Sequence, residues 1–316
     1  MNIVMLDAAT LGNDIDFECI RSLGALTVHN MTPAEKVCDN IKDAEVIIVN
    51  KVKLNEGNLS CAKNLKLICI TATGFDNIDL DYCREHSIAV CNVKGYSTDS
   101  VAQLTVALVL SLVMHLGVSD KYVKDGSYTK SGVQNCLTPV FHEINGMTWG
   151  VVGMGNIGRK TAQIAETMGA HVIAYNRTRR DDFEYTDLDD LCKRADIISI
   201  HLPLNADTEK LIDKEHISLM KKTAVVVNVA RGAVVDEESL TNAVINGDIG
   251  AIGIDVYSTE PLSSDSPYNR LLEYDNVIFT PHMAWGTFEA RNRCISEVGK
   301  NIDAFFNSNE KRNRIV

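Results

Sequence analysis

Short runs of apolar and β-branched residues alternate with amphipathic segments along most of the chain. The first series of runs lies at 2–6, 26–29, 45–50, 65–71 and 88–93. A second series lies at 149–153, 171–175, 196–202, 224–230, 250–256 and 276–281. Apolar strands that alternate with helical segments are typical of parallel sheets whose two faces are covered by helices. The pattern predicts two doubly wound α/β domains, each on a parallel sheet, with a cleft between them.

Three segments do not follow this alternation. A long helix is expected from about Ser97, and its apolar sequence predicts burial around most of its circumference. Residues 117–146 carry Gly, Ser and Pro with little periodicity, and a structureless loop of that length is unusual inside a compact domain. We expect this arm to pack across a domain seam or on a second subunit. A polar helix is expected from about Thr287 to Phe306.

The charge of the chain limits its partners. The sequence has 31 Lys and Arg residues against 42 Asp and Glu residues, which gives a formal net charge of −11. Such a chain is not expected to bind nucleic acid or an anionic membrane as its main partner. The N-terminus lacks the pattern of a secretory signal, and no run reaches the roughly 18 apolar residues of a membrane helix. We expect a soluble cytoplasmic protein.

Nine cysteines are spread along the chain without a Cys-x-x-Cys pair. This spacing fits neither a zinc site nor a disulfide framework. Several, such as Cys69 and Cys91, lie inside apolar runs, where cysteine packs as a small apolar side chain. We therefore expect neither a bound metal nor a redox role for these residues.

A glycine-rich turn directly follows the strand predicted at 149–153. Gly153, Gly155 and Gly158 form a G-x-G-x-x-G pattern at the start of an amphipathic helix, which is the context in which this pattern predicts dinucleotide binding. The three glycines permit a tight turn, close approach of the pyrophosphate, and close packing of the helix on its strand. Asn156 and Ile157 add backbone N–H groups at the helix N-terminus, which favours an anion.

The residues after the next strand bear on the choice of cofactor. An NAD site usually has Asp or Glu there to bind the ribose 2′-hydroxyl. Here the strand ends in Asn176, followed by Arg177, Thr178, Arg179 and Arg180. No carboxylate repels a 2′-phosphate, and the guanidinium groups favour one, so the turn favours NADP(H) over NAD(H). The alternative is a solvated basic turn balanced by the acidic residues at 181, 182 and 184.

Four polar residues follow strands of the second series: Arg231, Asp255, Glu260 and His282. Open α/β sheets bind ligands beyond the carboxyl ends of their strands. An Arg, a carboxylate and a His gathered beside a nicotinamide can hold a 2-oxo acid and protonate its carbonyl oxygen. Taken singly, Arg231 also fits a charge at a helix start, Glu260 a solvated turn residue, and His282 a loop histidine.

These motifs resemble the D-isomer-specific 2-hydroxyacid dehydrogenases over nearly the whole chain. The resemblance rests on VVGMGNIG at 151–158, HLPL at 201–204, NVARG at 228–232, DVYSTEP at 255–261 and the pair at 281–282. It implies that Arg231 binds the substrate carboxylate and carbonyl, that His282 is the acid/base, and that Glu260 orients His282. It also implies that Asp255 faces the nicotinamide. The predicted cofactor-binding residues are Gly153, Gly155, Asn156, Ile157, Gly158, Asn176, Arg177, Thr178, Arg179, Leu202, Pro203, Thr208, Val229, Ala230 and Asp255.

The resemblance further implies a discontinuous organisation. Residues 1–98 plus 285–316 would form a flavodoxin-like substrate domain, and residues 99–284 a Rossmann cofactor domain that includes the arm at about 117–146. Proteins of the family that the chain resembles are commonly dimeric through such an arm, so a homodimer is expected. Within the family, Gln103 stands where much of the family has Glu, and Asn176 departs from the usual Asp.

The segments 49–51, 70–79, 96–105 and 282–291 look most like the bacterial glycerate dehydrogenase or hydroxypyruvate reductase group. The implied reaction reduces hydroxypyruvate or glyoxylate to D-glycerate or glycolate. Alternatives are a D-lactate-type or bulky 2-keto acid reductase of the same family, or an NAD(H)-sensing corepressor-like protein. The candidate substrate-binding residues are Lys51, Thr73, Gly74, Arg231 and Trp285; Lys51 is otherwise an exposed loop lysine, and Trp285 otherwise packs against the last helix.

Overall fold

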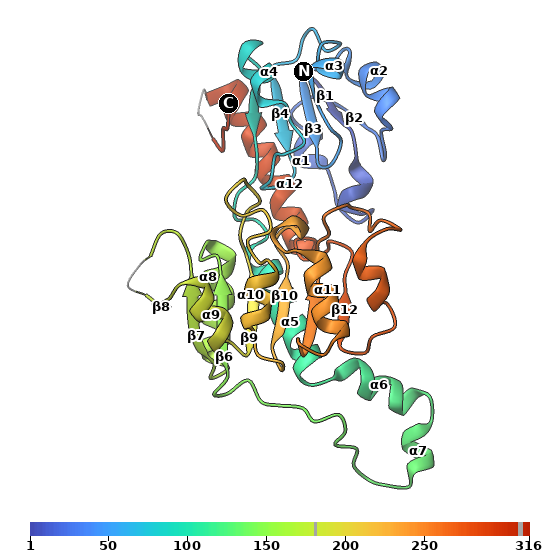
Figure 1. Cartoon of the computed structure of the whole chain (residues 1–316). Coiled ribbons are helices and arrows are strands. Elements are labelled where there is room, and N and C mark those ends of the chain that lie inside the picture. Colours follow the sequence, from blue (N-terminus) through green and yellow to red (C-terminus); the bar gives the residue numbers. More distant parts are fainter. Residues whose placement is uncertain (180–181, 309–311) are drawn as a thin grey trace. The chain divides into compact units, whose positions relative to one another are not determined.

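The chain forms two compact units, one built from Met1–Ser97 with Gly286–Val316 and the other from Thr98–Trp285. The computed structural model describes residues 1–179, 182–308 and 312–316 (Figure 1). Each joint between the units lies one residue from the predicted boundary, at 97/98 and at 285/286. The first unit is therefore discontinuous in sequence, and the second is a single insertion.

The first unit is built on a five-stranded parallel sheet with the order β2-β1-β3-β4-β5. This is the doubly wound order of flavodoxin-like folds. Its central strands β3 and β4 are buried along their whole length, because helices cover both faces, whereas the edge strand β2 is partly exposed. The strands are β1 (Asn2–Met5), β2 (Ala25–Val28), β3 (Val46–Val49), β4 (Leu67–Ile70) and β5 (Ala89–Cys91). The helices are α1 (Glu18–Arg21), α2 (Val37–Ile41), α3 (Glu56–Leu59), α4 (Leu80–Glu85) and α12 (Phe288–Asp303).

The second unit is built on a seven-stranded parallel sheet with the order β12-β11-β10-β9-β6-β7-β8. Its strands β6 and β9 are neighbours, so the sheet reverses its winding between them, as in a Rossmann fold. The strands are β6 (Thr148–Val152), β7 (His171–Tyr175), β8 (Glu184–Tyr185), β9 (Ile197–Ile200), β10 (Val225–Asn228), β11 (Ala251–Ile254) and β12 (Val277–Phe279). The helices are α5 (Thr98–Val113), α8 (Asn156–Thr167), α9 (Leu188–Arg194), α10 (Lys214–Leu219) and α11 (Glu237–Ile245).

The predicted long helix is α5, which packs against α8 and against β10, β11 and β12. Its exposed residues Asp99, Gln103 and Ala107 are four residues apart and form one narrow stripe, so most of the circumference is covered. Among the described residues, no single helix is long and apolar enough to span a membrane. Only the bent pair of α5 and the helix Leu116–Lys124, which meet at 61°, passes that test of length and composition.

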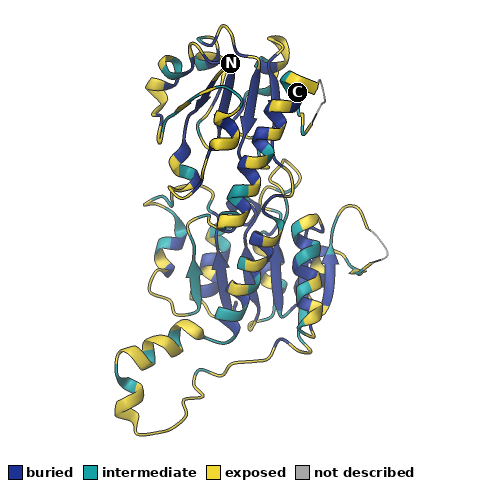
Figure 2. Cartoon of the chain, turned by 180° about the vertical axis from the view of Figure 1, so that it is seen from behind, coloured by how far each residue is buried: buried dark blue, intermediate teal, exposed yellow. Residues whose placement is uncertain are grey.

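The arm is more regular than its sequence predicts. It contains two helices, α6 (Leu116–Lys124) and α7 (Ser127–Ser131), before an extended stretch leads back to β6 (Figure 1). Neither helix has a buried residue, and the arm is almost uniformly exposed (Figure 2). Val133, Leu137 and Val140 are 60%, 68% and 69% exposed. The arm therefore presents apolar side chains that its own chain does not cover.

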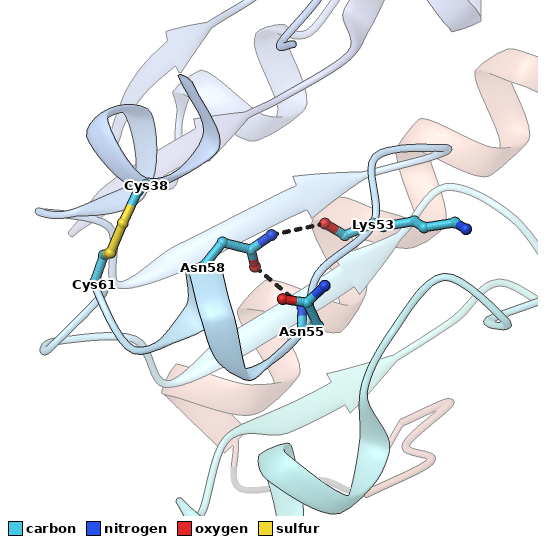
Figure 3. Close-up of a disulfide and its surroundings, with 5 residues drawn as sticks. All are labelled: Cys38, Lys53, Asn55, Asn58 and Cys61. Atoms are coloured by element: carbon cyan, nitrogen blue, oxygen red, sulfur yellow. Dashed lines mark hydrogen bonds between the residues drawn. A yellow bond between two sulfur atoms is a disulfide. The ribbon is translucent and has the colours of Figure 1, made fainter. Parts of the chain in front are cut away.

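The expectation that the cysteines form no disulfide is wrong for one pair. Cys38, in α2, and Cys61, just after α3, form a disulfide with their Cα atoms 5.5 Å apart (Figure 3). The other seven cysteines are free thiols. The sequence offered no signal for this pair, because its two members are brought together only by the packing of α2 against α3.

The disulfide predicts a measurable contribution to stability. It closes a loop with a sequence separation of 23, for which loop-closure entropy gives about 3 kcal/mol. The double variant Cys38→Ser/Cys61→Ser should therefore unfold at lower denaturant concentration, and dithiothreitol should have the same effect on the wild type. Cys136→Ser, which removes an exposed free thiol, is the control. Titration of nine thiols instead of seven in denatured, unreduced protein would contradict the pairing.

Candidate active site

The glycine turn between β6 and α8 has the geometry that dinucleotide binding requires. Gly153 has a φ of +100°, which disfavours any other residue. A Cβ on Gly158 would lie 2.0 Å from the carbonyl oxygen of Gly153, so only glycine lets the helix approach its strand this closely. A Cβ on Gly155 would meet no atom within 4 Å. The turn is thus packed on its inner side and open at Gly155, where a pyrophosphate needs to approach the backbone.

The surroundings of this turn fit a dinucleotide. Asn156 and Ile157 form the first turn of a 12-residue helix, whose N-terminus favours an anion. The turn lies at the point where the winding of the sheet reverses, which is where such folds bind their ligands. His201, directly after β9, has both ring nitrogens buried without a hydrogen-bond partner among the described residues. Burial lowers the pKa of His201 to about 3, so its imidazole is neutral, and its backbone carbonyl lies against the glycine turn, close to where a Cβ on Gly153 would be.

The turn after β7 is shaped by the side chain of Asn176. Its Oδ1 accepts the N–H of Met154 at 3.1 Å, and its Nδ2 donates to the carbonyl of Thr178 at 2.6 Å. The amide therefore ties the glycine turn to the basic turn. An aspartate could replace only the first of these two contacts, because it has no donor.

The predicted 2′-phosphate residues lie on the surface. The side chain of Arg177 is 91% exposed, with its Nη1 3.8 Å from Oδ2 of Asp207. Arg179 and Thr178 are also exposed, and Arg180 lies outside the described residues. The alternative interpretation assigned three acidic residues to balance this turn. Asp182 pairs with Arg159, Glu184 pairs with Arg194 and His171, and Asp181 lies outside the described residues.

The remaining predicted cofactor residues line the ends of β9 and β10. Thr208 closes the loop after β9 by donating to the carbonyl of Pro203 at 2.6 Å and accepting the N–H of Asn205 at 2.9 Å. Leu202 is half-buried in the same loop. Val229 and Ala230 are buried directly after β10.

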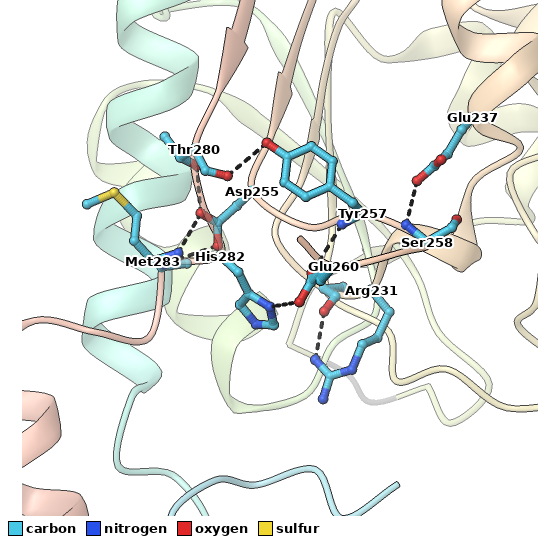
Figure 4. A network of polar contacts seen from close by, with 11 residues as sticks. Arg231, Glu237, Asp255, Tyr257, Ser258, Glu260, Thr280, His282 and Met283 are labelled. Carbon is cyan, nitrogen blue, oxygen red and sulfur yellow. Dashed lines mark hydrogen bonds and ion pairs between the residues drawn. The ribbon is translucent and has the colours of Figure 1, made fainter. Parts of the chain in front are cut away.

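The predicted catalytic residues follow three neighbouring strands. Arg231 comes after β10, Asp255 and Glu260 after β11, and His282 after β12. A Cβ on Gly232 would lie 2.0 Å from the carbonyl carbon of Tyr257. The chain that carries Arg231 is therefore pressed directly against the segment that leads to Glu260, which brings the two groups to one edge of the sheet. The guanidinium of Arg231 is half-buried and donates to its neighbour's carbonyl, that of Ala230, at 2.8 Å (Figure 4).

His282 and Glu260 form a hydrogen-bonded pair. Nδ1 of His282 lies 2.6 Å from Oε2 of Glu260, and the two side chains are 22% and 30% exposed (Figure 4). Because a carboxylate only accepts, we assign the hydrogen to Nδ1. Nε2 is then the nitrogen that can exchange a proton with a substrate. His282 has a left-handed φ of +50°, so its backbone conformation needs support from its neighbours.

Asp255 supports the loop that carries His282. Its fully buried carboxylate accepts the hydroxyl of Thr280 at 2.6 Å and the N–H groups of Met283 and Ala284 at 2.9 and 3.0 Å. Its carbonyl accepts the N–H of His282 at 2.8 Å. Burial raises the pKa of the Asp255 carboxyl, against the effect of these hydrogen bonds. Both oxygens of Asp255 thus bind the loop that carries His282, and the implied contact of Asp255 with a nicotinamide stays a prediction.

The candidate substrate residues of the first unit follow β3 and β4. Lys51 is exposed in a loop whose N–H groups at Asn50, Lys51 and Val52 all donate to the buried carboxylate of Asp7, at 2.6 to 3.1 Å. Thr73 is exposed, and its hydroxyl donates to the carbonyl of Val93 at 2.8 Å. Sequence reasoning missed Asp7, which is the second residue after β1 and belongs to no recognised motif.

Gly74 and Trp285, the other two candidate substrate residues, are only partly exposed. Gly74 is half-buried in the loop after β4. Trp285 is half-buried and packs against the apolar core that α5 and α8 form with the sheet of the second unit. The closing of a substrate pocket by Trp285 and its packing against the last helix both stay predictions.

The chain is similar to known proteins over most of its length. The family model described as D-isomer specific 2-hydroxyacid dehydrogenase, NAD binding domain, matches residues 106–284. A hydroxypyruvate reductase from Blautia hydrogenotrophica is 33% identical, with 96% of this chain and 97% of that protein covered. A glyoxylate reductase from Thermofilum pendens is 36% identical, with 85% of this chain and 80% of that protein covered.

Solved structures give the same result. The D-lactate dehydrogenase from Aquifex aeolicus complexed with NAD and lactic acid has a TM-score of 0.84 and 33% identity, with 100% of this chain and 99% of that chain covered. An acyclic imino acid reductase in complex with NADPH and D-Arg has a TM-score of 0.87 and 27% identity, with both chains fully covered. These matches establish an oxidoreductase that reduces 2-oxo acids by hydride transfer from a nicotinamide cofactor, and the chain belongs to the D-isomer specific 2-hydroxyacid dehydrogenase family.

Proposed function

We propose that the enzyme reduces hydroxypyruvate and glyoxylate to D-glycerate and glycolate, with NADPH as the preferred reductant. The observation that carries the reaction type is the 2.6 Å contact between His282 and Glu260, at the edge of the sheet where Arg231 also lies. The substrate class is supported by the similarity to a hydroxypyruvate reductase and a glyoxylate reductase.

Arg231, Glu260 and His282 would each have a separate role in the reaction. When bound, the nicotinamide cofactor supplies the hydride that reduces the carbonyl carbon of the 2-oxo acid. The planar guanidinium of Arg231 would hold the substrate carboxylate and polarise its carbonyl oxygen. Nε2 of His282 would hold the proton that this oxygen needs as negative charge develops on it. General acid catalysis of this kind contributes about 10²–10⁴-fold, and Glu260 keeps the ring in the required tautomer.

The loops after β3 and β4 would set the choice of substrate. Lys51 suits the distal hydroxyl of hydroxypyruvate, and backbone N–H groups near Thr73 and Gly74 suit the carboxylate. The loop of Lys51 has little freedom, because the carboxylate of Asp7 accepts three consecutive N–H groups from it. A panel of hydroxypyruvate, glyoxylate, pyruvate and a bulky 2-oxo acid separates this proposal from a D-lactate-type or bulky-substrate reductase.

Arg231→Ala should lower kcat/KM for hydroxypyruvate by at least about 10²-fold, because it removes the charged contacts to both the carboxylate and the carbonyl. The Kd of the cofactor, measured by fluorescence titration, should stay the same. Arg231→Lys should recover only part of the activity, since a point charge cannot replace the planar fork. An unchanged kcat/KM in Arg231→Ala would show that substrate binds elsewhere.

The preference for NADPH rests on the turn after β7. Asn176 holds the turn with an amide and offers no carboxylate of its own to the ribose, and Asp182 and Glu184 are engaged by other cations. The exposed guanidinium of Arg177 is the first candidate for a 2′-phosphate, with Thr178 as a neutral donor and Arg179 second.

Arg177→Ala should weaken NADPH selectively, by about 1.5–3 kcal/mol if one charged hydrogen bond is lost, and leave NADH unchanged. Arg194→Ala is the matched control, because this arginine is bound by Glu184 and Asp190. Asn176→Asp should move the ratio of NADPH to NADH affinity toward NADH. That substitution also removes the hydrogen bond from Asn176 to the carbonyl of Thr178, which affects the turn with either cofactor. The test is therefore the ratio of the two affinities and not either affinity alone. A wild-type kcat/KM that is equal or higher with NADH would refute the preference.

The arm suggests how the enzyme assembles. We infer that the arm at about 117–146 packs on a second copy of the chain, because a monomer would leave Val133, Leu137 and Val140 in water. Sedimentation at micromolar concentration should give twice the 34.8 kDa mass of the chain. Leu137→Glu/Val140→Glu should shift the protein toward the monomer, whereas Ser131→Glu, in the same arm, should not. A wild-type monomer would contradict this assembly.

A further inference from the structure

Tyr257 is hydrogen-bonded to Glu260 and to Thr280, which precedes the pair at 281–282. Its backbone N–H donates to Oε1 of Glu260 at 3.2 Å, and its hydroxyl donates to the carbonyl of Thr280 at 2.9 Å (Figure 4). The carbonyl of Thr280 also accepts the N–H of His282, at 3.1 Å. One residue thus touches Glu260 directly and is one hydrogen bond removed from the backbone of His282.

These contacts form a closed circuit. The Tyr257 backbone binds Glu260, Glu260 binds the ring of His282, the backbone of His282 binds Thr280, and Thr280 binds the Tyr257 hydroxyl. A closed circuit restrains the distance between its members more than a chain of contacts with a free end. This matters here because His282 holds a left-handed backbone conformation that few residues adopt without support.

The ring of Tyr257 is itself well anchored. It packs against Tyr268 and Phe279, with ring centroids 6.3 and 6.2 Å away. Phe279 is the last residue of β12 and directly precedes Thr280, so the ring and the hydroxyl hold adjacent residues of the same strand end. Burial raises the pKa of Tyr257 to about 12, which keeps the hydroxyl protonated as a donor at ordinary pH.

We propose that Tyr257 is a positioning residue that sets the alignment of His282 with Glu260 and, through it, the efficiency of proton delivery to the substrate. The proposal rests on the proposed function, because it assumes that His282 is the acid/base. The aromatic ring of Tyr257 makes the packing contacts to Tyr268 and Phe279, and its hydroxyl supplies the link to Thr280. A phenylalanine at this position would keep the packing and open the circuit.

The test compares Tyr257→Phe with wild type in the reduction of hydroxypyruvate. We expect kcat to fall about three- to tenfold, the range that corresponds to one net hydrogen bond of ordinary strength, while KM and the Kd of the cofactor change little. The solvent isotope effect on kcat should increase, because proton delivery becomes slower relative to the hydride step. A merely structural role would lower the melting temperature without changing the isotope effect.

Two further variants sharpen the result. Tyr268→Phe removes a hydroxyl from the same aromatic group without affecting the contact to Thr280, so it should keep the wild-type kcat and isotope effect. In the double variant Tyr257→Phe/Glu260→Gln, the loss should be smaller than the product of the single losses, because both substitutions act on the orientation of His282.

The outcomes separate the two hypotheses. A wild-type enzyme that does not turn over 2-oxo acids would refute the proposed function. An active wild type with an unaltered Tyr257→Phe variant would overturn only the positioning role, as would an equal loss in Tyr268→Phe or fully multiplicative losses in the double variant.

Discussion

A buried carboxylate determines where the candidate acid/base of this enzyme lies. Asp255 is fully enclosed, and both of its oxygens bind the segment from Thr280 to Ala284, on either side of His282. Burying a carboxylate without such hydrogen-bond donors costs much free energy. Moving the loop away from Asp255 would incur this cost, so the loop is held firmly in place. The left-handed backbone of His282 and its contact with Glu260 both depend on this arrangement.

Glycines set the second constraint, because they decide how closely neighbouring segments approach. Gly232 lets the chain after β10 touch the backbone of Tyr257, and Gly158 lets α8 touch the turn at Gly153. A side chain at either position would push backbone atoms apart, since the nearest atoms belong to the main chain. Catalytic and cofactor-binding groups on neighbouring loops are thus brought together by the absence of side chains as much as by the presence of polar ones.

The sequence predicted the features that depend on local patterns. Eleven apolar runs matched strands. Central strands of a parallel sheet are buried on both faces, so they appear in the sequence as continuous apolar runs. The two-residue strand β8 was missed, since two residues have no period. The helices α6 and α7 were missed because neither has a buried face, and without one the sequence shows no helical period of apolar residues.

The features that sequence missed depend on which distant side chains meet. The pairing of Cys38 with Cys61, the three N–H groups that Asp7 accepts, and the Tyr257 hydroxyl on Thr280 arise from tertiary packing between separate elements. The residues Arg231, Glu260 and His282 could be proposed from sequence because each follows a strand in a motif. Their geometry could not, because it depends on the buried carboxylate of Asp255 and on the close contact at Gly232.

In the proposed reaction, Nε2 of His282, held by Glu260 and by the loop that Asp255 binds, faces the carbonyl oxygen of a 2-oxo acid whose carboxylate is held by Arg231. A crystal structure of the enzyme with NADP⁺ and the unreactive 2-oxo acid analogue oxamate tests it most directly. We expect Nε2 within hydrogen-bond distance, about 3 Å, of the amide carbonyl oxygen that stands in for the keto oxygen, and the Arg231 guanidinium on the carboxylate. A carbonyl oxygen bound by another donor, with His282 turned away from it, would rule out His282 as the acid/base.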